Sequence, residues 1–435
     1  MHKLNFSHFI SKAEQGKYLL LPFEMPANAA SLRLSYTYER FHQEQIPLQN
    51  GNFLARDKVN TVDLGLLAPD GAQVGASGSA YPEIFVSQTS ASPGYKPAPL
   101  VPGTWQIMLG AYKIAPEGVN VRLELQIESK KQRWLKGDLH VHSRQSDGIH
   151  SLEHLARHAR AHGLDFIAIT DHNQPVKRAS FPKIDGFTII PGQEWTHYLG
   201  HSNFLGVEEA YSGAFFANSL VEIQDRFTQA RANGALITIN HPLESDFGFR
   251  IDLEQIPYDL IEVWNGPMRP RNLETIAWWD QMLKSGKKQV ATCGSDYHKD
   301  TVFERLADPC INVLAWSDSE EDILEAVRHG RSYFTYSPTP LHALLSVGDY
   351  SYGDSLGWEA GLTAALAVQN LEQGDEIRLI DQDGSRTLFS ADRKGDLTME
   401  IPILKPGYLR LEIWRHFFSI LPQMPALVSN PIWID

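Results

Sequence analysis

Two short apolar runs that end in histidine constrain the fold of this chain more than any other feature of its sequence. The first run ends in DLHVH at residues 138–142, and the second, FIAIT at 166–170, is followed by Asp171-His172-Asn173. Successive side chains of a strand point to opposite faces, so His140 and His142 share one face. Neutral imidazole is the commonest protein metal ligand. Two such strands with a helix between them indicate a metal site at the mouth of a β/α barrel.

A histidine or a carboxylate that could bind a metal lies near the end of almost every strand predicted between residues 136 and 337. Active sites of such barrels lie at the carboxyl ends of the strands, so these side chains are expected to converge. Histidines mixed with two or three carboxylates suit Zn²⁺, Mn²⁺ or Fe²⁺ better than Ca²⁺ or Mg²⁺, which prefer oxygen ligands. Because one ion cannot use all of these ligands, we expect two or three divalent ions, with a carboxylate bridging a pair. The candidate ligands are His140, His142, Asp147, His172, Glu194, His201, His241, Asp296 and His298.

Each motif also has an explanation that involves no metal. A single HxH pair on a strand is weak evidence for a metal. Asp171-His172 is compatible with a helix N-cap beside a surface histidine, and His241-Pro242 with a turn. Glu194 before Trp195 is compatible with a buried carboxylate paired to arginine. The joint pattern favours the metal interpretation, because independent accidents would not all fall at the ends of strands.

Histidine also recurs every four residues along the helix predicted for 151–162, a spacing that can chelate a metal. The apolar stripe of that helix includes Leu152 and Leu155, and His154 lies about 200° from Leu152 at about 100° per residue. We therefore expect these histidines to face away from the core and to lie outside the site. They are His150, His154, His158 and His162.

The chain is predicted to form three domains. Its 435 residues are too many for one small core, and the pattern of predicted strands and helices changes twice along the sequence. Residues 1–132 are β-rich, with antiparallel strands best arranged as a sandwich. Residues 133–337 alternate apolar runs with helical segments in about seven β/α units, one fewer than the eight of the closed barrel. Residues 338–435 are β-rich again and predict a second sandwich-like domain.

Charge and composition limit the partners and the compartment. The net charge of −13 disfavours nucleic acid and anionic membrane surfaces as partners. No run approaches the ~18 apolar residues of a membrane span, and the first residues lack the apolar core of a signal peptide, so the cytoplasm is expected. The two cysteines, Cys293 and Cys310, are predicted to be small buried core residues.

Seven motifs, in order and within residues 136–337, resemble the PHP (polymerase and histidinol phosphatase) family. Among its members, the EWT…GHSN form of the middle motifs is most similar to the carbaryl-hydrolase-like branch, called CehA/McbA-like. The motifs are DLHVHS (138–143), SDG (146–148), TDHN (170–173), GQEW (192–195), GHSN (200–203), NHP (240–242) and GSDYH (294–298).

The resemblance implies a distorted (β/α)7 barrel of TIM type with a dinuclear or trinuclear metal site. It implies that one ion is held by His140, His142, Glu194 and Asp296. Glu194 would bridge to a second ion held by His201 and His241, and a third would be held by Asp147, His172 and His298. His197 has the same strand parity as His201, and the Gly-His-x-Asn context assigns the role to His201. Asp147 stands where some polymerase-type members carry histidine.

The expected reaction is hydrolysis of an ester by a metal-bridging hydroxide. Its expected catalytic residues are Glu194, Asp296 and His201. Phosphomonoester or phosphodiester hydrolysis is ranked first, as the commonest chemistry of the family. Hydrolysis of a carbamate, amide or carboxylic ester is second, and a binding module with a vestigial barrel is third. The expected partner is a small-molecule ester or phosphoester, and the sequence does not specify the oligomeric state.

Two further groups of residues are candidates for supporting roles. Asp138, Asn173 and Asn203 are expected to orient imidazoles through the second ring nitrogen, although for Asp138 a polar residue on the opposite strand face is an equal alternative. The arginines that follow the fifth and sixth strands could clamp a phosphate, with surface arginine as the alternative for at least two of them. They are Arg250, Arg269 and Arg271.

Overall fold

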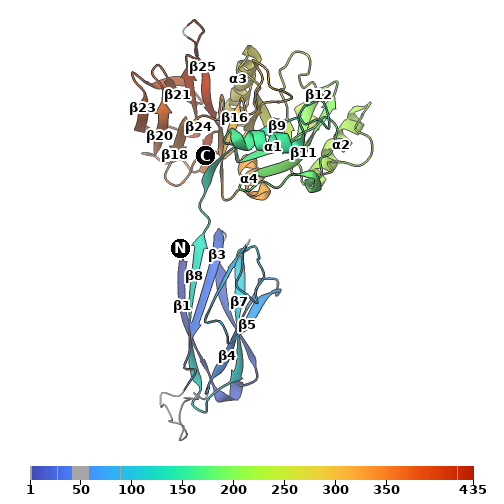
Figure 1. Cartoon of the computed structure of the whole chain (residues 1–435). Helices are drawn as coiled ribbons and strands as arrows, with labels where there is room; N and C mark the ends of the chain where they lie inside the picture. Colours follow the sequence, from blue (N-terminus) through green and yellow to red (C-terminus); the bar gives the residue numbers. More distant parts are fainter. Residues whose placement is uncertain (1, 27, 42–57, 89, 419) are drawn as a thin grey trace. The chain divides into compact units, whose positions relative to one another are not determined.

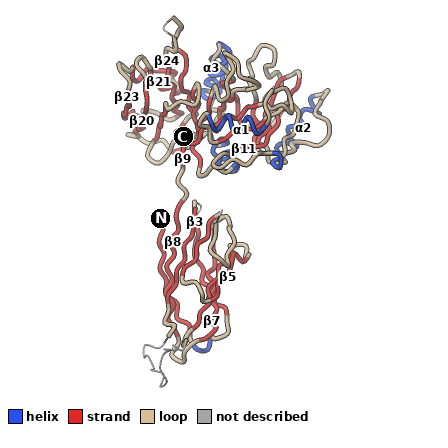
Figure 2. The backbone as a smooth tube through the Cα atoms, viewed as in Figure 1, coloured by secondary structure: helices blue, strands red, loops and turns tan. Residues whose placement is uncertain are grey.

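A computed structural model gives the structure of the protein and describes residues 2–26, 28–41, 58–88, 90–418 and 420–435. The chain divides into two compact units, Met1–Lys131 and Gln132–Asp435. Strands outnumber helices throughout the described residues, and the α-helices all belong to the second unit (Figure 2). Within those residues, every helix is too short or too polar to cross a membrane.

The first unit consists of two four-stranded antiparallel sheets, ordered β1-β8-β3-β6 and β2-β7-β4-β5 (Figure 1). In β8, valine, leucine and isoleucine alternate with polar residues, and the apolar side chains are buried. Both sheets contribute to one buried cluster, which includes Leu34, Leu64 and Trp105. The strands are β1 His2–Ile10, β2 Tyr18–Met25, β3 Ala29–Thr37, β4 Thr61–Leu67, β5 Gln73–Gly78, β6 Glu83–Ser87, β7 Gly103–Lys113 and β8 Val119–Ser129, with the 3-10 turn η1 at Lys12–Glu14.

The α/β part of the second unit is a run of strands ordered β15-β14-β13-β12-β11-β10-β9-β16. The pairs β9–β10, β10–β11, β13–β14 and β14–β15 are parallel. The strands are β9 Arg133–Val141, β10 Phe166–Ile169, β11 Thr188–His197, β12 Gly200–Leu205, β13 Leu236–Ile239, β14 Leu260–Asn265, β15 Val290–Gly294, β16 Cys310–Ala315 and β17 Ser332–Thr335. The helices are α1 Leu152–Ala161, α2 Leu220–Ala232, α3 Pro270–Lys284 and α4 Glu320–Arg328, with 3-10 turns η2 Arg178–Ser180 and η3 Leu253–Gln255.

The roughly seven β/α units expected from the sequence are not all complete. Only four α-helices occur among the described residues, and β10–β11 and β13–β14 are joined through 3-10 turns. Strand β12 runs antiparallel to both of its neighbours, because the two residues Tyr198 and Leu199 reverse the chain after β11. The reversal places the first residues of β12 at the edge where the parallel strands end.

Strands β9 and β15, which lie far apart in the order of this run, meet at the candidate ligands. Val141, at the end of β9, forms a parallel bridge with Tyr297, which follows β15. The N–H of His142 donates to the carbonyl of Tyr297 at 2.9 Å, and the N–H of Tyr297 donates to the carbonyl of His140 at 3.3 Å. Residues distant in sequence, at the ends of β9 and β15, are therefore neighbours in space.

Most of the remaining strands continue the same sheet. β17 pairs with β25, and the order continues through β24, β21 and β22, beside a separate sheet β18-β20-β23. Because one sheet runs through residues on both sides of 337/338, the second unit is compact as a whole, and the domain boundaries expected from the sequence stay predictions. These strands are β18 His342–Ser346, β19 Ser355–Leu356, β20 Thr363–Leu371, β21 Glu376–Asp381, β22 Gly384–Ser390, β23 Gly395–Pro402, β24 Gly407–Arg415, β25 Met424–Ser429 and β26 Ile432–Ile434.

Two local predictions are confirmed. The buried face of α1 is formed by Leu152, Leu155, Ala156 and Ala159, and Ser151 caps the helix by accepting from the N–H of His154 at 3.2 Å. Cys293 and Cys310 are both buried free thiols. The prediction of an α/β chain rich in strands is also confirmed.

Candidate metal centre

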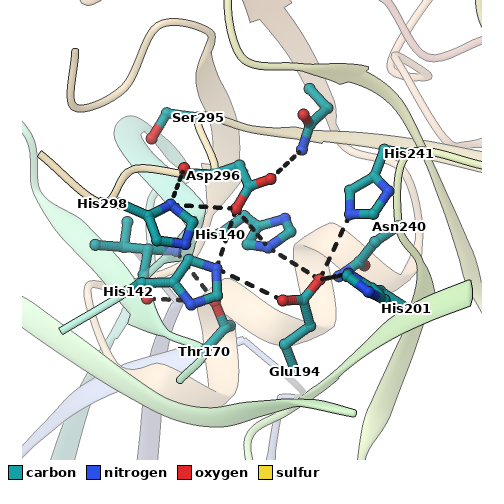
Figure 3. Close-up of polar contacts among 12 residues, drawn as sticks. His140, His142, Thr170, Glu194, His201, Asn240, His241, Ser295, Asp296 and His298 are labelled. Atoms are coloured by element: carbon teal, nitrogen blue, oxygen red, sulfur yellow. Dashed lines mark hydrogen bonds and ion pairs between the residues drawn. The ribbon is translucent and has the colours of Figure 1, made fainter. Parts of the chain in front are cut away.

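All nine candidate ligands form one connected cluster. Glu194, in the C-terminal half of β11, has its carboxylate between histidines of several segments (Figure 3). Its Oε1 lies 3.3 Å from Nε2 of His140, 3.2 Å from Nδ1 of His201 and 3.5 Å from Nε2 of His241. Its Oε2 lies 2.7 Å from Nδ1 of His172. One buried carboxylate thus contacts imidazoles from four separate segments.

A second carboxylate, Asp296, joins the histidines of β9 to the segment after β15. Its Oδ1 lies 3.1 Å from Nε2 of His142 and 3.3 Å from Nε2 of His140. Asp147, in the loop after β9, lies 3.2 Å from Nε2 of His298 and 3.6 Å from Nε2 of His172. These contacts complete the cluster at its more exposed side.

Three overlapping groups have ligand atoms that all lie within 4.8 Å of one another and could each hold a metal ion. They differ in part from the sets that the family resemblance implies. His142 also joins the group of Asp147, and His172 also joins the group of Glu194, while His241 is outside all three although it contacts Glu194. The groups are His142, Asp147, His172 and His298; His140, His142 and Asp296; and His172, Glu194 and His201.

The electrostatics of the cluster depend on its burial and on its mixed charge. Burial alone would lower the pKa of His140, but the carboxylates of Asp296, Glu262 and Glu194 outweigh it and hold that pKa well above its usual value. Burial would likewise raise the pKa of Glu194, but the neighbouring histidines hold it well below the usual value. The pKa of Asp296 is held low for the same reason. Both carboxylates are therefore kept ionised, as metal ligands must be.

The unsatisfied atoms of the cluster are consistent with a bound cation. Nε2 of His140, Nε2 of His142 and Oε2 of Glu194 are buried, lie within ion-pair distance of opposite partners and make no hydrogen bond of acceptable geometry. A buried polar atom without a hydrogen bond costs roughly 1–3 kcal/mol. A divalent ion among these lone pairs would remove that cost, so the donor set matches the predicted metal centre.

Glu262 is a functional candidate that the sequence analysis missed. Its Oε1 lies 2.9 Å from Nδ1 of His140, and its Oε2 accepts from the N–H of His241 at 3.0 Å and from Nδ2 of Asn265 at 3.1 Å. It lies inside β14, in the apolar run LIEVW, and is almost fully buried. A carboxylate within such a run was the available signal, because a buried charge requires a partner.

The residues expected to orient imidazoles bind the backbone instead. The Asp138 carboxylate accepts from the N–H groups of His140, Ser295 and Ala307. Burial raises the pKa of Asp138 to about 6. Asn173 exchanges two hydrogen bonds with the backbone of Thr196, and Asn203 donates to the carbonyl of Leu139 at 3.4 Å.

Two other side chains contact the ligands directly. Asn240 donates to Oε1 of Glu194 at 2.8 Å, and the hydroxyl of Thr196 lies 2.6 Å from Nδ1 of His172.

The competing histidines are occupied elsewhere. Nε2 of His197 donates to the carbonyl of Ala217 at 2.9 Å, and its Nδ1 accepts from the N–H of Leu199 at 3.1 Å. Both ring nitrogens of His197 therefore bind backbone, whereas His201 contacts Glu194. The four histidines of the α1 segment belong to none of the three groups, and two of them, His158 and His162, line a different cavity.

A cavity of about 780 Å³ lies over the cluster. Six of the candidate ligands line it, and its other walls carry exposed aromatic side chains, including Tyr198, which is 95% exposed. Among the described residues that line it there is no lysine or arginine. The ligands in the wall are Asp147, His172, His201, His241, Asp296 and His298, and the aromatic residues are Tyr198, Phe215, Phe216 and Phe247.

The three arginines proposed for a phosphate clamp lie outside this wall. Arg269 donates to Asn265 at 3.2 Å, with Glu244 at 3.7 Å, and Arg271 pairs with Glu274. Arg250 lines a neighbouring cavity. The structure therefore gives no geometric support to a clamp by these arginines on a phosphate at the metal cluster.

The histidine–carboxylate cluster is a site of the class that could hold divalent metal ions. Residues 138–255 match the model of the PHP domain, so the chain contains a PHP domain and the predicted resemblance is confirmed over that segment. The branch within the family stays a prediction. No curated protein matches the chain.

Two solved structures are similar to the chain at low identity. One is a two-domain protein from Bacteroides vulgatus that contains a predicted PHP-like metal-dependent phosphoesterase. It is 19% identical, with a TM-score of 0.39, over 69% of this chain and 95% of that chain. The other is an amidohydrolase from Chromobacterium violaceum with bound sulfate and no metal. It is 16% identical, with a TM-score of 0.29, over 39% of this chain and 89% of that chain.

Proposed function

We propose that the protein is a metal-dependent hydrolase that cleaves a phosphomonoester or phosphodiester bond at the nine-residue cluster, using two or three divalent ions such as Zn²⁺, Mn²⁺ or Fe²⁺. The observation that carries the proposal is the position of Glu194, whose two carboxylate oxygens lie between imidazoles of four segments. When bound, the ions would activate water and neutralise the charge that develops on the substrate oxygens.

The chain's own residues have distinct tasks in this proposal. His201 and Asp296 line the cavity and so stand within reach of a substrate, while Glu194 is fully buried beneath them. Asn240 fixes the rotation of the Glu194 carboxylate through its hydrogen bond to Oε1. Glu262 and Thr196 fix the rings of His140 and His172, which keeps the ligand set preorganised.

A second candidate, hydrolysis of a carbamate, amide or carboxylic ester, is favoured by the cavity wall. Tyr198, Phe215, Phe216 and Phe247 offer flat apolar surface, and the described wall residues include no lysine or arginine that would neutralise a dianionic phosphate. Aromatic walls of this kind bind flat, weakly charged groups well. A binding module with a vestigial barrel is the third candidate, and the complete ligand cluster argues against it.

The proposal also covers the type of barrel, the flanking segments and the cellular compartment. The barrel would be a distorted (β/α)7 type of the CehA/McbA-like branch, supported by the bridge between the ends of β9 and β15. The flanking β-rich segments would be sandwiches, supported by the shared core of the two N-terminal sheets. We further propose that the enzyme is cytoplasmic, acts on a small-molecule substrate, and itself binds neither nucleic acid nor membranes.

The test is a substrate panel with elemental analysis of the purified protein. p-Nitrophenyl phosphate, bis-p-nitrophenyl phosphate and a naphthyl carbamate are assayed with Mn²⁺ or Zn²⁺. We expect bound divalent metal and turnover of a phosphoester, both lost in the His140→Ala/His142→Ala double variant. The matched control is His150→Ala/His154→Ala, which removes two histidines of the α1 segment. Full activity in the first variant, or protein without metal affinity, would contradict the proposal.

A further inference from the structure

A second cavity of about 490 Å³ adjoins the cavity over the metal cluster, and the two share part of their lining. The shared residues come from the end of β11 and from the segment before α2. They are His197, Tyr198, Ala217 and Asn218. Tyr198, in the shared lining, is 95% exposed, so a ligand that occupied both cavities would pass over its side chain.

The shared wall is rigidly held. Nε2 of His197 donates to Ala217, and the ring of His197 stacks on Trp195 with 5.0 Å between centroids and 6° between planes. Nε1 of Trp195 donates to the carbonyl of Phe215 at 2.9 Å. These contacts fasten the segment before α2 to β11, so the two cavities keep a fixed separation.

The second cavity contains the one lysine or arginine that lines either cavity within the described part of the chain, Arg250. Its backbone is anchored beside the shared wall, because its N–H donates to the carbonyl of Leu199 at 2.7 Å. Its guanidinium forms no ion pair within 4.0 Å with any residue that the structure describes, whereas Arg269 and Arg271 are each paired with a glutamate. The single carboxylate in this lining, Asp252, accepts from the N–H of Glu254 at 3.1 Å as the cap of η3.

We propose that this second cavity is a subsite for the distal end of the substrate, and that Arg250 binds an anionic group there. An unpaired guanidinium presents a planar fork that matches a carboxylate or a phosphate. The substrate is then an ester whose reacting bond lies at the metal cluster and whose far end carries a carboxylate or phosphate. This inference rests on the proposed hydrolase function and specifies its substrate class.

The substrates for the test are three p-nitrophenyl phosphodiesters that share one linker and differ at its far end. One ends in a carboxylate, one in a phosphate and one in a neutral carboxamide. In the Mn²⁺-loaded full chain we expect a lower KM for the two anionic substrates. In Arg250→Met that preference is lost through a rise in KM of about ten-fold or more at unchanged kcat, because the contact binds substrate and transition state equally.

Two further variants separate charge from structure. Arg250→Lys keeps the charge without the fork and retains part of the preference. Arg393→Met removes an exposed arginine that lines neither cavity and leaves the KM values unchanged. Equal KM for charged and neutral substrates in the wild-type protein, or equal losses for all three in Arg250→Met, would overturn the subsite.

Calorimetric binding of the same three compounds keeps this inference distinct from the hydrolase proposal. If none is hydrolysed but the anionic compounds bind more tightly than the carboxamide, and lose that advantage in Arg250→Met, the subsite stands and the hydrolase proposal fails. If hydrolysis proceeds without discrimination, the subsite fails alone. If no compound is bound or hydrolysed, both are wrong.

Discussion

Nδ1 of His140 lies 2.9 Å from Oε1 of Glu262, a residue 122 positions later in the chain. Both side chains are buried, and the other ring nitrogen of His140 faces Glu194 and Asp296. A carboxylate behind a ligating imidazole fixes the tautomer and increases the basicity of the nitrogen that faces the metal. Glu262 is therefore the residue that orients His140 in the proposed centre.

Glu262→Gln is expected to weaken metal affinity by about 10–100-fold, because the amide keeps the shape but loses the charge. Affinity is measured by titration against a chelator that competes for Mn²⁺ or Zn²⁺. The control is Glu254→Gln, since Glu254 is an exposed residue paired with Lys287. If both variants bind metal as the wild-type protein does, Glu262 does not orient the ligand.

The positions of the ligands could be predicted because parallel strands end at one edge of a sheet. His140 lies at the end of such a strand, and His172 and Asp296 follow two others, so their convergence follows from the pattern alone. His201 is different, since it lies at the start of a reversed strand. Its choice over His197 required the motif context, because the backbone contacts of His197 are visible only in the folded chain.

Other features depend on tertiary contacts that no local pattern contains. Asp138 lies two residues before His140, but its carboxylate braces three backbone N–H groups rather than a ring. Glu262 stands inside an apolar strand, where its partner is set by the neighbouring strands. Between β10 and β11 and between β13 and β14 the chain crosses through single 3-10 turns, so the repeat of strand and helix in the barrel pattern is interrupted there.

The aromatic wall of the cavity predicts a dependence on substrate shape. The ring of Phe247 lies 5.8 Å from that of His201, and its side chain is 58% exposed, so it is available to a ligand. Phe247→Ala is expected to raise KM for naphthyl carbamate by about two- to ten-fold, the equivalent of one lost aromatic contact. KM for p-nitrophenyl phosphate, with its smaller ring, should change less. Equal changes for the two substrates would contradict a role for Phe247 in recognition.

The environment of His342, a histidine outside the metal cluster, predicts that the stability of the protein depends on pH. Nδ1 of His342 lies 2.7 Å from the hydroxyl of Tyr333, and its ring packs edge-on against Trp134. Burial, with a further contribution from the charge of Lys136, lowers the pKa of His342 below its usual value of about 6.5. The unfolded chain therefore binds this proton more readily, and the free energy of unfolding decreases as the pH falls below about 6.5.

His342→Asn keeps a hydrogen-bond acceptor without the titration. The drop in unfolding midpoint between pH 7.5 and pH 5 is expected to be smaller in this variant than in the wild-type protein, as measured by thermal melts followed by circular dichroism. His154→Asn, at an exposed histidine on α1, serves as the control. The same drop in all three proteins would show that His342 carries no part of the acid sensitivity.

The contacts of Arg410 predict that the segments before and after the expected domain boundary at 337/338 unfold together. Arg410 lies in β24 with its side chain only 1% exposed, and it forms two hydrogen bonds of 2.7 Å with Asp280 on α3. A further bond of 2.7 Å joins it to Glu412. Arg410→Met leaves these carboxylates without their cation, so a loss of about 3–5 kcal/mol in the free energy of unfolding is expected.

Because Arg410 and Asp280 lie on opposite sides of the expected boundary, the loss should lower the midpoint of one common transition of residues 132–435. Denaturant unfolding is followed both by tryptophan fluorescence and by loss of bound metal. Arg386→Met is the matched control, since the Arg386 side chain is 48% exposed and its pair with Asp381 is therefore screened by solvent far more than the pairs of Arg410. If Arg410→Met unfolded no more easily than Arg386→Met, or shifted fluorescence without shifting metal release, residues 338–435 would be an independent domain.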